Sequence, residues 1–349
     1  MSKAPDRSLA RRLFEPEAID KQSPFGFVIT YALLFLWALV VLVPLYWVLI
    51  TSFKGVGEVD NGPFYIPFVD FQPSLAAWDF MLLQNYTLGP YLNSVVVALM
   101  STVFSVLIGA LAAYSLVRIR FAVKLLGVAF FVLLLIAVIV AVAGFGVAWP
   151  IAFIVALALF VIALFTLVNR TQAAVGNNDV EFWIISNRIM PPIVAVLPIY
   201  VMFQHLRLLD TQAALIATYT AVNLPIVVWL TRDFFAAIPR DLEESAEIDG
   251  ASKLRVFATI ALPLVRSGLV ATFLLVLILA WNEYLLALFL SNAKAQTMPV
   301  LVSAQNTTRG PQWWNMSVLI VVMIAPVIAI ASVLQKHIAR GLLVGAVKG

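Results

Sequence analysis

The chain has 349 residues, of which 63% are hydrophobic and 11% are charged, with a mean hydropathy of +1.01. Soluble domains carry about 25% charged residues, so this composition excludes an ordinary soluble protein and indicates a multi-pass membrane protein. The net charge of +4 is too small to suggest a nucleic-acid partner. The chain has no cysteine and two histidines, which excludes disulfides and cysteine- or histidine-rich metal sites.

We expect an all-α bundle of about eight membrane-spanning helices, because eight apolar stretches can each cross a hydrocarbon core about 30 Å thick. Residues 1–24 are polar and form an arm before the first span. Residues 25–349 form the transmembrane domain. The predicted spans are residues 25–50, 90–117, two within 125–168, 182–203, 213–230, 269–290 and 316–334.

The third and fourth spans are predicted from one uninterrupted apolar stretch. Residues 125–168 are 44 residues without a charge. As a single helix they would extend about 66 Å, twice the thickness of the hydrocarbon core. The stretch must therefore fold back into a hairpin, and the run from Gly144 to Pro150, which contains two glycines and a proline, is the expected turn.

The distribution of lysine and arginine predicts how the spans are oriented. An even number of spans places both termini on one side of the membrane. With that side inside, the inner segments hold 18 lysines and arginines and the outer loops hold 4. Inner loops of membrane proteins are enriched in these residues, so both termini and the polar segment 232–266 are expected in the cytoplasm.

That polar segment carries the most informative motif of the chain. Its first helix is expected to begin near Pro239, where a missing N–H is tolerated, and to end at Asp249 and Gly250. A second helix is expected between Ala251 and Pro263. The first helix carries five acids, namely Asp241, Glu243, Glu244, Glu247 and Asp249.

Two interpretations of this segment differ in their charge pattern. An amphipathic helix lying on the membrane surface would be rich in basic residues, because the inner leaflet is anionic. The five acids stand against Arg240 alone. This pattern favours docking to a protein, and the small residues Ser245, Ala246 and Ala251 would let another surface approach closely.

The segment resembles the conserved cytoplasmic loop of binding-protein-dependent ABC importer permeases. That loop has Glu-Ala-Ala, three residues, Gly, nine residues, Ile, one residue, and Leu-Pro. Six residues fall at these spacings, and Ser245 replaces the usual second-position Ala. They are Glu244, Ala246, Gly250, Ile260, Leu262 and Pro263. The stretches Asn223-Leu224-Pro225 and Trp281-Asn282-Glu283-Tyr284 narrow the resemblance to the maltose-type carbohydrate permeases.

The resemblance has one departure, because permeases of this group usually have six spans. The hairpin at residues 125–168 is therefore interpreted as an insertion into a six-span core. Two spans inserted together leave the sidedness of all later segments unchanged, in agreement with the lysine and arginine count.

The resemblance implies a permease subunit in a bacterial inner membrane that is not itself an enzyme and imports a sugar or polyol. It implies that this chain pairs with a second, homologous permease, two ATP-binding subunits and an extracytoplasmic solute-binding protein. ATP and Mg²⁺ would be bound by the ATPase, since the chain has no phosphate-binding G-x-x-x-x-G-K-[ST] sequence. The expected coupling residues are Asp241, Glu243, Glu244, Ser245, Ala246, Asp249, Gly250, Ala251 and Pro263.

Three polar residues within or near the spans are weaker candidates for the substrate path: Asn223, Asn282 and Glu283. Bonds between packed helices would explain them equally well. The alternative function is an ion-coupled secondary transporter, which would require paired intramembrane carboxylates or histidine relays. A membrane-embedded enzyme is a third possibility, but the sequence presents no nucleophile–base pair and no catalytic residue.

Overall fold

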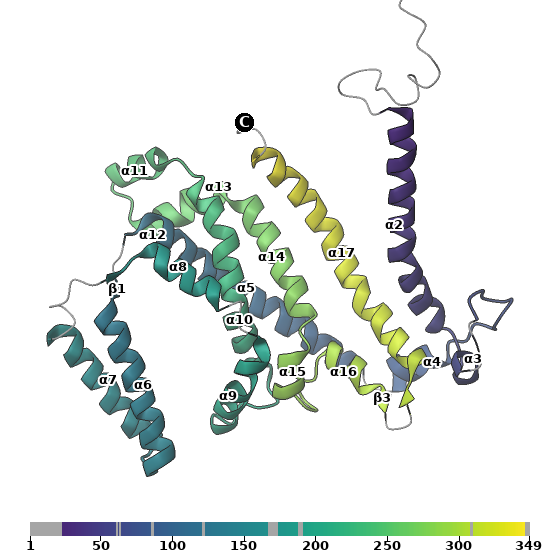
Figure 1. Ribbon diagram of the computed structural model, residues 1–349, viewed down its shortest axis with the longest axis horizontal. Coiled ribbons are helices and arrows are strands. Elements are labelled where there is room, and N and C mark those ends of the chain that lie inside the picture. Colours follow the sequence, from purple (N-terminus) through teal and green to yellow (C-terminus); the bar gives the residue numbers. More distant parts are fainter. Residues whose placement is uncertain are drawn as a thin grey trace, which may run out of the picture. The chain divides into compact units, whose positions relative to one another are not determined.

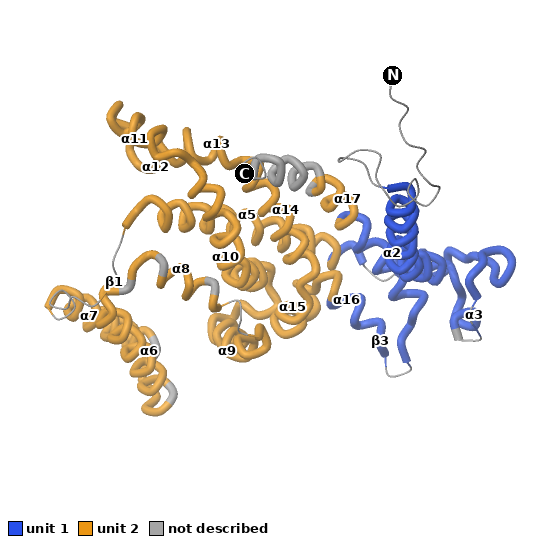
Figure 2. Tube along the Cα trace, turned by 45° about the horizontal axis from the view of Figure 1, so that its top comes forward, with its two compact units in different colours: residues 1–89, 300–326 blue, residues 90–299, 327–349 orange. Residues whose placement is uncertain are grey.

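The computed structural model describes residues 23–60, 62, 64–84, 87–120, 123–166, 174–187, 191–307 and 310–345. Helices dominate these residues (Figure 1), as the composition predicts. The chain divides into two compact units (Figure 2). Unit 1 comprises residues 1–89 and 300–326, and unit 2 comprises residues 90–299 and 327–349. Most of the predicted polar arm, residues 1–22, lies outside the described residues.

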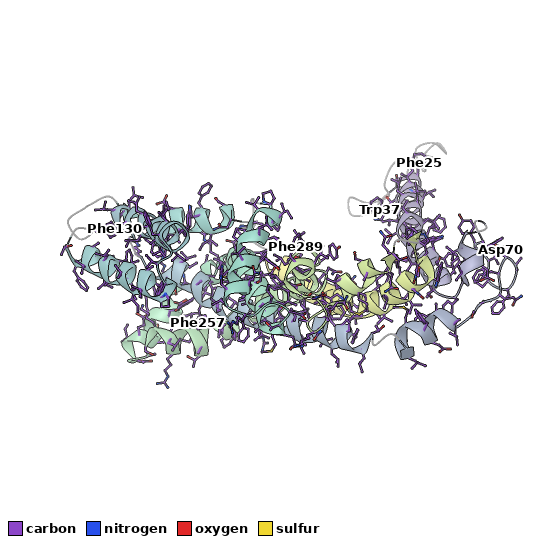
Figure 3. All side chains as sticks on the ribbon, turned by 90° about the horizontal axis from the view of Figure 1, so that it is seen from below. Phe25, Trp37, Asp70, Phe130, Phe257 and Phe289 are labelled. Carbon is purple, nitrogen blue, oxygen red and sulfur yellow. The ribbon has the colours of Figure 1, made fainter. Side chains whose placement is uncertain are left out.

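Unit 1 contains the long apolar helix α2, Pro24–Thr51. Its 28 residues extend about 42 Å, enough to cross a hydrocarbon core. The Ser23 hydroxyl caps the helix by accepting the Gly26 N–H at 3.1 Å. The large side chains of α2 are mostly exposed, as for Trp37 at 68% (Figure 3), which suits a helix surrounded by lipid. The shorter elements are α3 (Val56–Asp60), α4 (Ala76–Asp79), the π-helix η1 (Phe80–Gln84), β3 (Asn306–Thr307) and β4 (Gly310–Pro311).

Unit 2 is built around two long helices, α5 (Leu88–Arg118) and α10 (Gln212–Ala236). Its core brings Tyr114 of α5, Phe235 of α10 and Phe257 together in aromatic contact. The other helices are α8 (Asn177–Ser186), α9 (Pro192–His205), α11 (Arg240–Ile248), α12 (Lys253–Val256), the π-helix η3 (Phe257–Ala261), α13 (Leu262–Leu264), α14 (Arg266–Trp281) and α15 (Leu285–Leu290). Helices α16 (Met298–Ala304) and α17 (Trp313–Gly345) contribute residues to both units.

The predicted turn in the apolar stretch 125–168 is confirmed. Helix α6 (Leu125–Phe145) and helix α7 (Trp149–Thr166) pack against each other, with the rings of Phe131 and Phe160 5.6 Å apart. Gly146 ends α6 with a φ of +66°, a left-handed conformation that glycine adopts at little cost. The strands β1 (Val123–Lys124) and β2 (Ala174–Val175) pair antiparallel at the base of the hairpin.

The predicted count of eight spans is not confirmed. Among the described residues, five helices are long and apolar enough to cross a membrane, or six if α12–α13 and α14, bent by 81° at their junction, form one span. The predicted span 182–203 is instead two shorter helices, α8 and α9, and a new helix begins after Pro191, which cannot donate a backbone hydrogen bond. The predicted span 269–290 also breaks, at residues 282–284 between α14 and α15.

Candidate functional site

The acidic motif forms the expected short helix and turn. Helix α11 begins after Pro239, and Asp249 and Gly250 end it. Gly250 has a φ of +85°, a conformation that strains residues with a Cβ atom. Helix α11 lies at one end of unit 2, here named the α11 end, and α9 and α15 lie at the opposite end of α10, here named the loop end (Figure 1).

The acids of α11 divide between its two faces. Asp241 and Glu244 are exposed, with the small residue Ser245 beside them. Ile248 on the same helix is 86% exposed, so the outer face presents apolar as well as acidic groups.

The other predicted coupling residues lie on and just after the same helix–turn. Ala246 and Ala251 are partly exposed, while Asp249 and Pro263 are exposed. Glu247 forms an ion pair with Lys253 at the start of α12. Eight of the nine predicted residues thus lie on α11 and the turn after it, with one of them facing inward, whereas Pro263 lies separately on α13.

That inward residue is Glu243, which is buried against α5. Its Oε2 accepts a hydrogen bond from the Tyr114 hydroxyl at 2.9 Å, and its Oε1 accepts one from Arg118 Nε at 2.8 Å. The Arg118 and Glu243 side chains are only 8% and 6% exposed. The expectation that the acids of α11 form one docking surface is therefore corrected for Glu243, because its carboxylate is already paired inside unit 2.

Arg118 also joins α10 to the site. Its Nη2 donates to the backbone carbonyls of Phe235 at 3.0 Å and Ile238 at 2.8 Å. The last carbonyls of a helix lack the usual partners within the helix, and the Phe235 carbonyl here accepts the Ile238 N–H at 3.2 Å. Arg118 adds a charged donor to this carbonyl and to that of Ile238. One guanidinium thus connects α5, the end of α10 and α11. We name the group Tyr114, Arg118, Glu243, Phe235 and Ile238 the inner clamp.

The three substrate-path candidates lie at separate places in unit 2. Asn223 is buried and donates to the Tyr219 carbonyl at 2.9 Å within α10. Asn282 is exposed at the break between α14 and α15, where its amide donates to the Ile278 carbonyl. Glu283 accepts the Leu286 N–H at 3.0 Å and so caps the first turn of α15. The bonds of Asn223 and Glu283 are local, to residues four and three positions away in the chain, and a role of these residues in the substrate path stays a prediction.

A second polar cluster, at the loop end, was missed by the sequence reasoning. The Asp210 carboxylate accepts backbone N–H groups from Asn292 at 2.8 Å, Lys294 at 3.0 Å and Ala295 at 2.9 Å. Asp210 has a φ of +57°. An Asp-Thr pair directly before a helix was the available signal, since both residues favour helix starts.

Neighbouring side chains of α5 and α10 complete this cluster. Asn93 donates to the carbonyls of Lys294 at 2.9 Å and Gln296 at 3.0 Å, and it accepts from Gln212 at 2.6 Å. Ser94 accepts the Met298 N–H at 2.8 Å. We name the outer clasp the segment 291–298, the residues Asn93, Ser94 and Asp210 that bind it, and Gln212, which bonds to Asn93.

The electrostatics of Asp210 follow from these contacts. Partial burial alone would raise the pKa of this carboxyl, but the backbone N–H groups of residues 292–295 stabilise its charged form and hold the pKa below its usual range. A depressed folded-state pKa contributes stability above the unfolded value of about 3.9 and loses it as the pH falls through the folded value.

The variant Asp210→Asn should loosen the segment 292–295 at pH 7. The amide keeps one acceptor oxygen and loses the charge, so we expect the backbone N–H groups of Asn292, Lys294 and Ala295 to exchange with solvent about tenfold faster, equivalent to about 1.4 kcal/mol. As the pH falls below about 4 the difference should narrow, because the Asp210 carboxylate becomes protonated first in the opened segment and then, at the lower folded-state pKa, in the folded protein. Equal exchange rates at pH 7, measured by hydrogen–deuterium exchange, would contradict this account.

No cluster of three or more histidine or acidic side chains able to hold a metal ion occurs in the part of the chain that the structure describes. The expectation that this chain binds no cofactor stays a prediction.

Comparison with known proteins gives consistent matches. The family model described as "Binding-protein-dependent transport system inner membrane component" matches residues 180–344. A probable ABC transporter permease of Sinorhizobium fredii is 31% identical over 316 residues, which cover 89% of this chain and 92% of that protein. A trehalose/maltose transport system permease of Thermococcus litoralis is 29% identical over 321 residues, covering 90% of this chain and 94% of that protein.

Two further matches agree with these. A diacetylchitobiose uptake system permease of Streptomyces coelicolor is 28% identical over 315 residues, covering 89% of this chain and 85% of that protein. One chain in the crystal structure of a bacterial ABC transporter involved in importing the acidic polysaccharide alginate has a TM-score of 0.59. Its sequence is 20% identical, and the match covers 95% of this chain and 99% of that chain, so the two share a fold.

Proposed function

Since this chain belongs to the family of binding-protein-dependent transport system inner membrane components, and is therefore an ABC transporter permease subunit, we propose that it helps to form the pore of an ATP-driven importer for a sugar or polyol. Relatives named for the uptake of diacetylchitobiose and of trehalose or maltose support this solute class. Family membership also favours this function over the ion-coupled alternative, because ABC transporters derive their energy from ATP.

The α11 end faces the cytoplasm of a bacterial inner membrane in this proposal. The excess of lysine and arginine in the segments assigned to the inner side, 18 against 4, supports this orientation. Both termini then lie in the cytoplasm, and the segment 291–298 lies on the outer side. The hairpin of α6 and α7 is an insertion into the permease domain, and its apolar side chains suit a position in lipid.

Coupling to ATP hydrolysis takes place at α11. The single observation that carries this step is the division of its acids: Glu243 is bonded inward, whereas Asp241 and Glu244 point to solvent. The inward face of α11 is bonded to α5 through Glu243, while its exposed face is free to bind a partner. A partner can therefore move the helix without separating it from the spans. Glu244 would form the charge-assisted bond to the ATPase, and Gly250 sets the angle of the helix.

The assembly contains further chains in this proposal. They are a second homologous permease, two ATP-binding subunits that bind ATP and Mg²⁺, and an extracytoplasmic solute-binding protein. Asn223, Asn282 and Glu283 remain weak candidates for the solute path. Of these, Asn282 is the best placed, because it is exposed at a helix break.

The variant Glu244→Lys should abolish solute uptake while the chain still inserts into the membrane. Reversing the charge places a lysine where the ATPase is expected to supply a basic group, and like charges repel. The complex would be co-expressed, reconstituted in lipid, and assayed for ATP hydrolysis and for uptake of maltose, trehalose and diacetylchitobiose. We expect at least a tenfold loss of solute-stimulated hydrolysis.

The matched control is Asp233→Lys, a charge reversal on α10 at a carboxylate that is 78% exposed. It should leave hydrolysis within about twofold of the native rate, because only α11 is proposed to dock. Normal transport by Glu244→Lys would refute the docking role. Transport by this chain alone, without an ATPase, would instead favour an ion-coupled carrier.

A further inference from the structure

Contacts at four levels join α5 and α10 of unit 2, and they advance in the same direction along both helices. Near the loop end Gln212 bonds to Asn93, and further along the Ser105 hydroxyl donates to the Thr220 carbonyl at 3.2 Å. Gly109 then lies against Val227. Near the α11 end come the aromatic contact of Tyr114 with Phe235 and the bonds from Arg118 to the carbonyls of Phe235 and Ile238.

The contacts between the two helices span nearly the same number of residues on each. The contacting positions advance from 93 to 118 on α5 and from 212 to 238 on and just after α10. At 1.5 Å per residue, about 25 residues correspond to roughly 37 Å, more than the thickness of the hydrocarbon core. The close approach of Gly109 to Val227 and the side-chain hydrogen bonds at the other levels resist sliding of one helix past the other, because packed interfaces do not deform continuously.

Each end of this helix pair is hydrogen-bonded to a different segment of the chain. At the loop end the outer clasp holds segment 291–298 through Asn93 and Ser94 of α5 and through Asp210, which lies two residues before α10. Gln212, the first residue of α10, bonds to Asn93 and so joins the two helices at this level. At the α11 end the inner clamp holds Glu243 of α11 to α5. The same guanidinium, that of Arg118, holds the end of α10.

From these contacts we propose that α5 and α10 move as one rigid pair. The outer clasp and the inner clamp are then the positioning residues through which a movement of segment 291–298 changes the position of α11, and a movement of α11 changes the position of segment 291–298. This inference rests on the proposed function, in which segment 291–298 lies on the outer side, the side of the solute-binding protein, and α11 meets the ATPase. Docking at one end then biases the position of the other end through the pair. Such coupling must be reciprocal, because it is a free energy shared by two binding events.

The test uses the whole reconstituted transporter with its solute-binding protein at saturating concentration. Two readouts are needed: the ratio of stimulated to basal ATP hydrolysis, and the hydrogen exchange of residues 240–248 with and without the binding protein. The outer variant is Asn93→Ala with Asp210→Asn. The inner variant is Arg118→Met with Glu243→Met, which replaces the buried ion pair with apolar side chains of similar length. Gln212→Leu, which removes one clasp bond, is a milder second outer variant.

We expect the native complex to change its α11 exchange when the binding protein docks. The outer variant should lose this change and lower the stimulation ratio at least fivefold, although its substitutions lie at the far end of both helices. Gln212→Leu should give a partial loss. Reciprocally, ATP binding should alter exchange at residues 292–295 in the native complex and not in the inner variant.

Matched controls are Asp233→Asn and Arg232→Met, single losses of charge at the partly exposed ion pairs of α10. Both should leave the stimulation ratio within about twofold. A native-like α11 response in the outer variant would overturn the proposal. Glu244→Lys distinguishes a failure of the proposed function from a failure of the rigid-pair inference. If this variant leaves the stimulation of ATP hydrolysis intact, the proposed function fails. If it abolishes stimulation while the clasp and clamp variants respond normally, only the rigid-pair inference fails.

Discussion

The variant Arg118→Met should destabilise the protein by about 3–5 kcal/mol, the usual consequence of removing one partner of a buried ion pair. Glu243 would keep a buried carboxylate with only the Tyr114 hydroxyl as a partner. The carbonyls of Phe235 and Ile238 would lose the donor that they share. In detergent, the midpoint of thermal unfolding, followed by the loss of monodisperse protein after heating, should fall by on the order of 5–10 °C.

The double variant Arg118→Met with Glu243→Met should recover much of this loss. Replacing a buried ion pair with apolar side chains of similar size is often neutral, because both desolvation penalties disappear together. Arg232→Met is the matched control, since the Arg232 side chain is 36% exposed and pairs with Glu181 at 2.7 Å. It should cost no more than about 1 kcal/mol. A single variant as stable as the native protein would show that the inner clamp contributes nothing to stability.

The variant Gly109→Ala should cost about 1–3 kcal/mol by forcing α5 and α10 apart. A Cβ atom at this position would lie 2.5 Å from Val227 Cγ1 and 2.8 Å from Val227 Cβ, far inside van der Waals contact. Valine is branched at Cβ and has few alternative rotamers in a helix, so it cannot turn aside. The same thermal assay measures the loss.

A second substitution makes this prediction specific. Val227→Ala should relieve only part of the strain, because the Val227 Cβ atom, which remains, is itself too close. Gly89→Ala in the same helix is the control, since nothing lies within 4 Å of the added Cβ atom. It should be neutral or slightly stabilising, because alanine has the higher helix propensity. An unchanged midpoint for Gly109→Ala would show that the helices can separate at no cost.

The sequence anticipated the features that depend on local composition. The membrane class and the reversal of direction between residues 125 and 166 followed from the length of uncharged stretches. The helix that ends at Asp249 and Gly250 followed from proline, acids and glycine at characteristic positions. Such signals need only neighbours in the chain, because capping and turn preferences act over a few residues.

The span count was harder to predict for a physical reason. An apolar run of sufficient length is compatible with one continuous helix or with two helices separated by a break. At the first break the sequence has Pro191, directly before α9. At the second break, residues 282–284 include no proline or glycine. There the break is stabilised by the Glu283 carboxylate, which caps α15, and by the Tyr219 hydroxyl, which donates to the Glu283 carbonyl from another helix.

By itself, then, the sequence determined that this protein crosses a membrane and presents a short acidic helix between spans. Only the tertiary structure decided which acid of that helix faces inward. Tyr114 and Arg118 are 129 and 125 residues from Glu243 along the chain. Partners this distant leave no local pattern, and the packing of α5 against α10 and α11 brings their side chains within hydrogen-bonding distance. The outer clasp has the same origin, since Asp210 meets its partners 82 to 85 residues later.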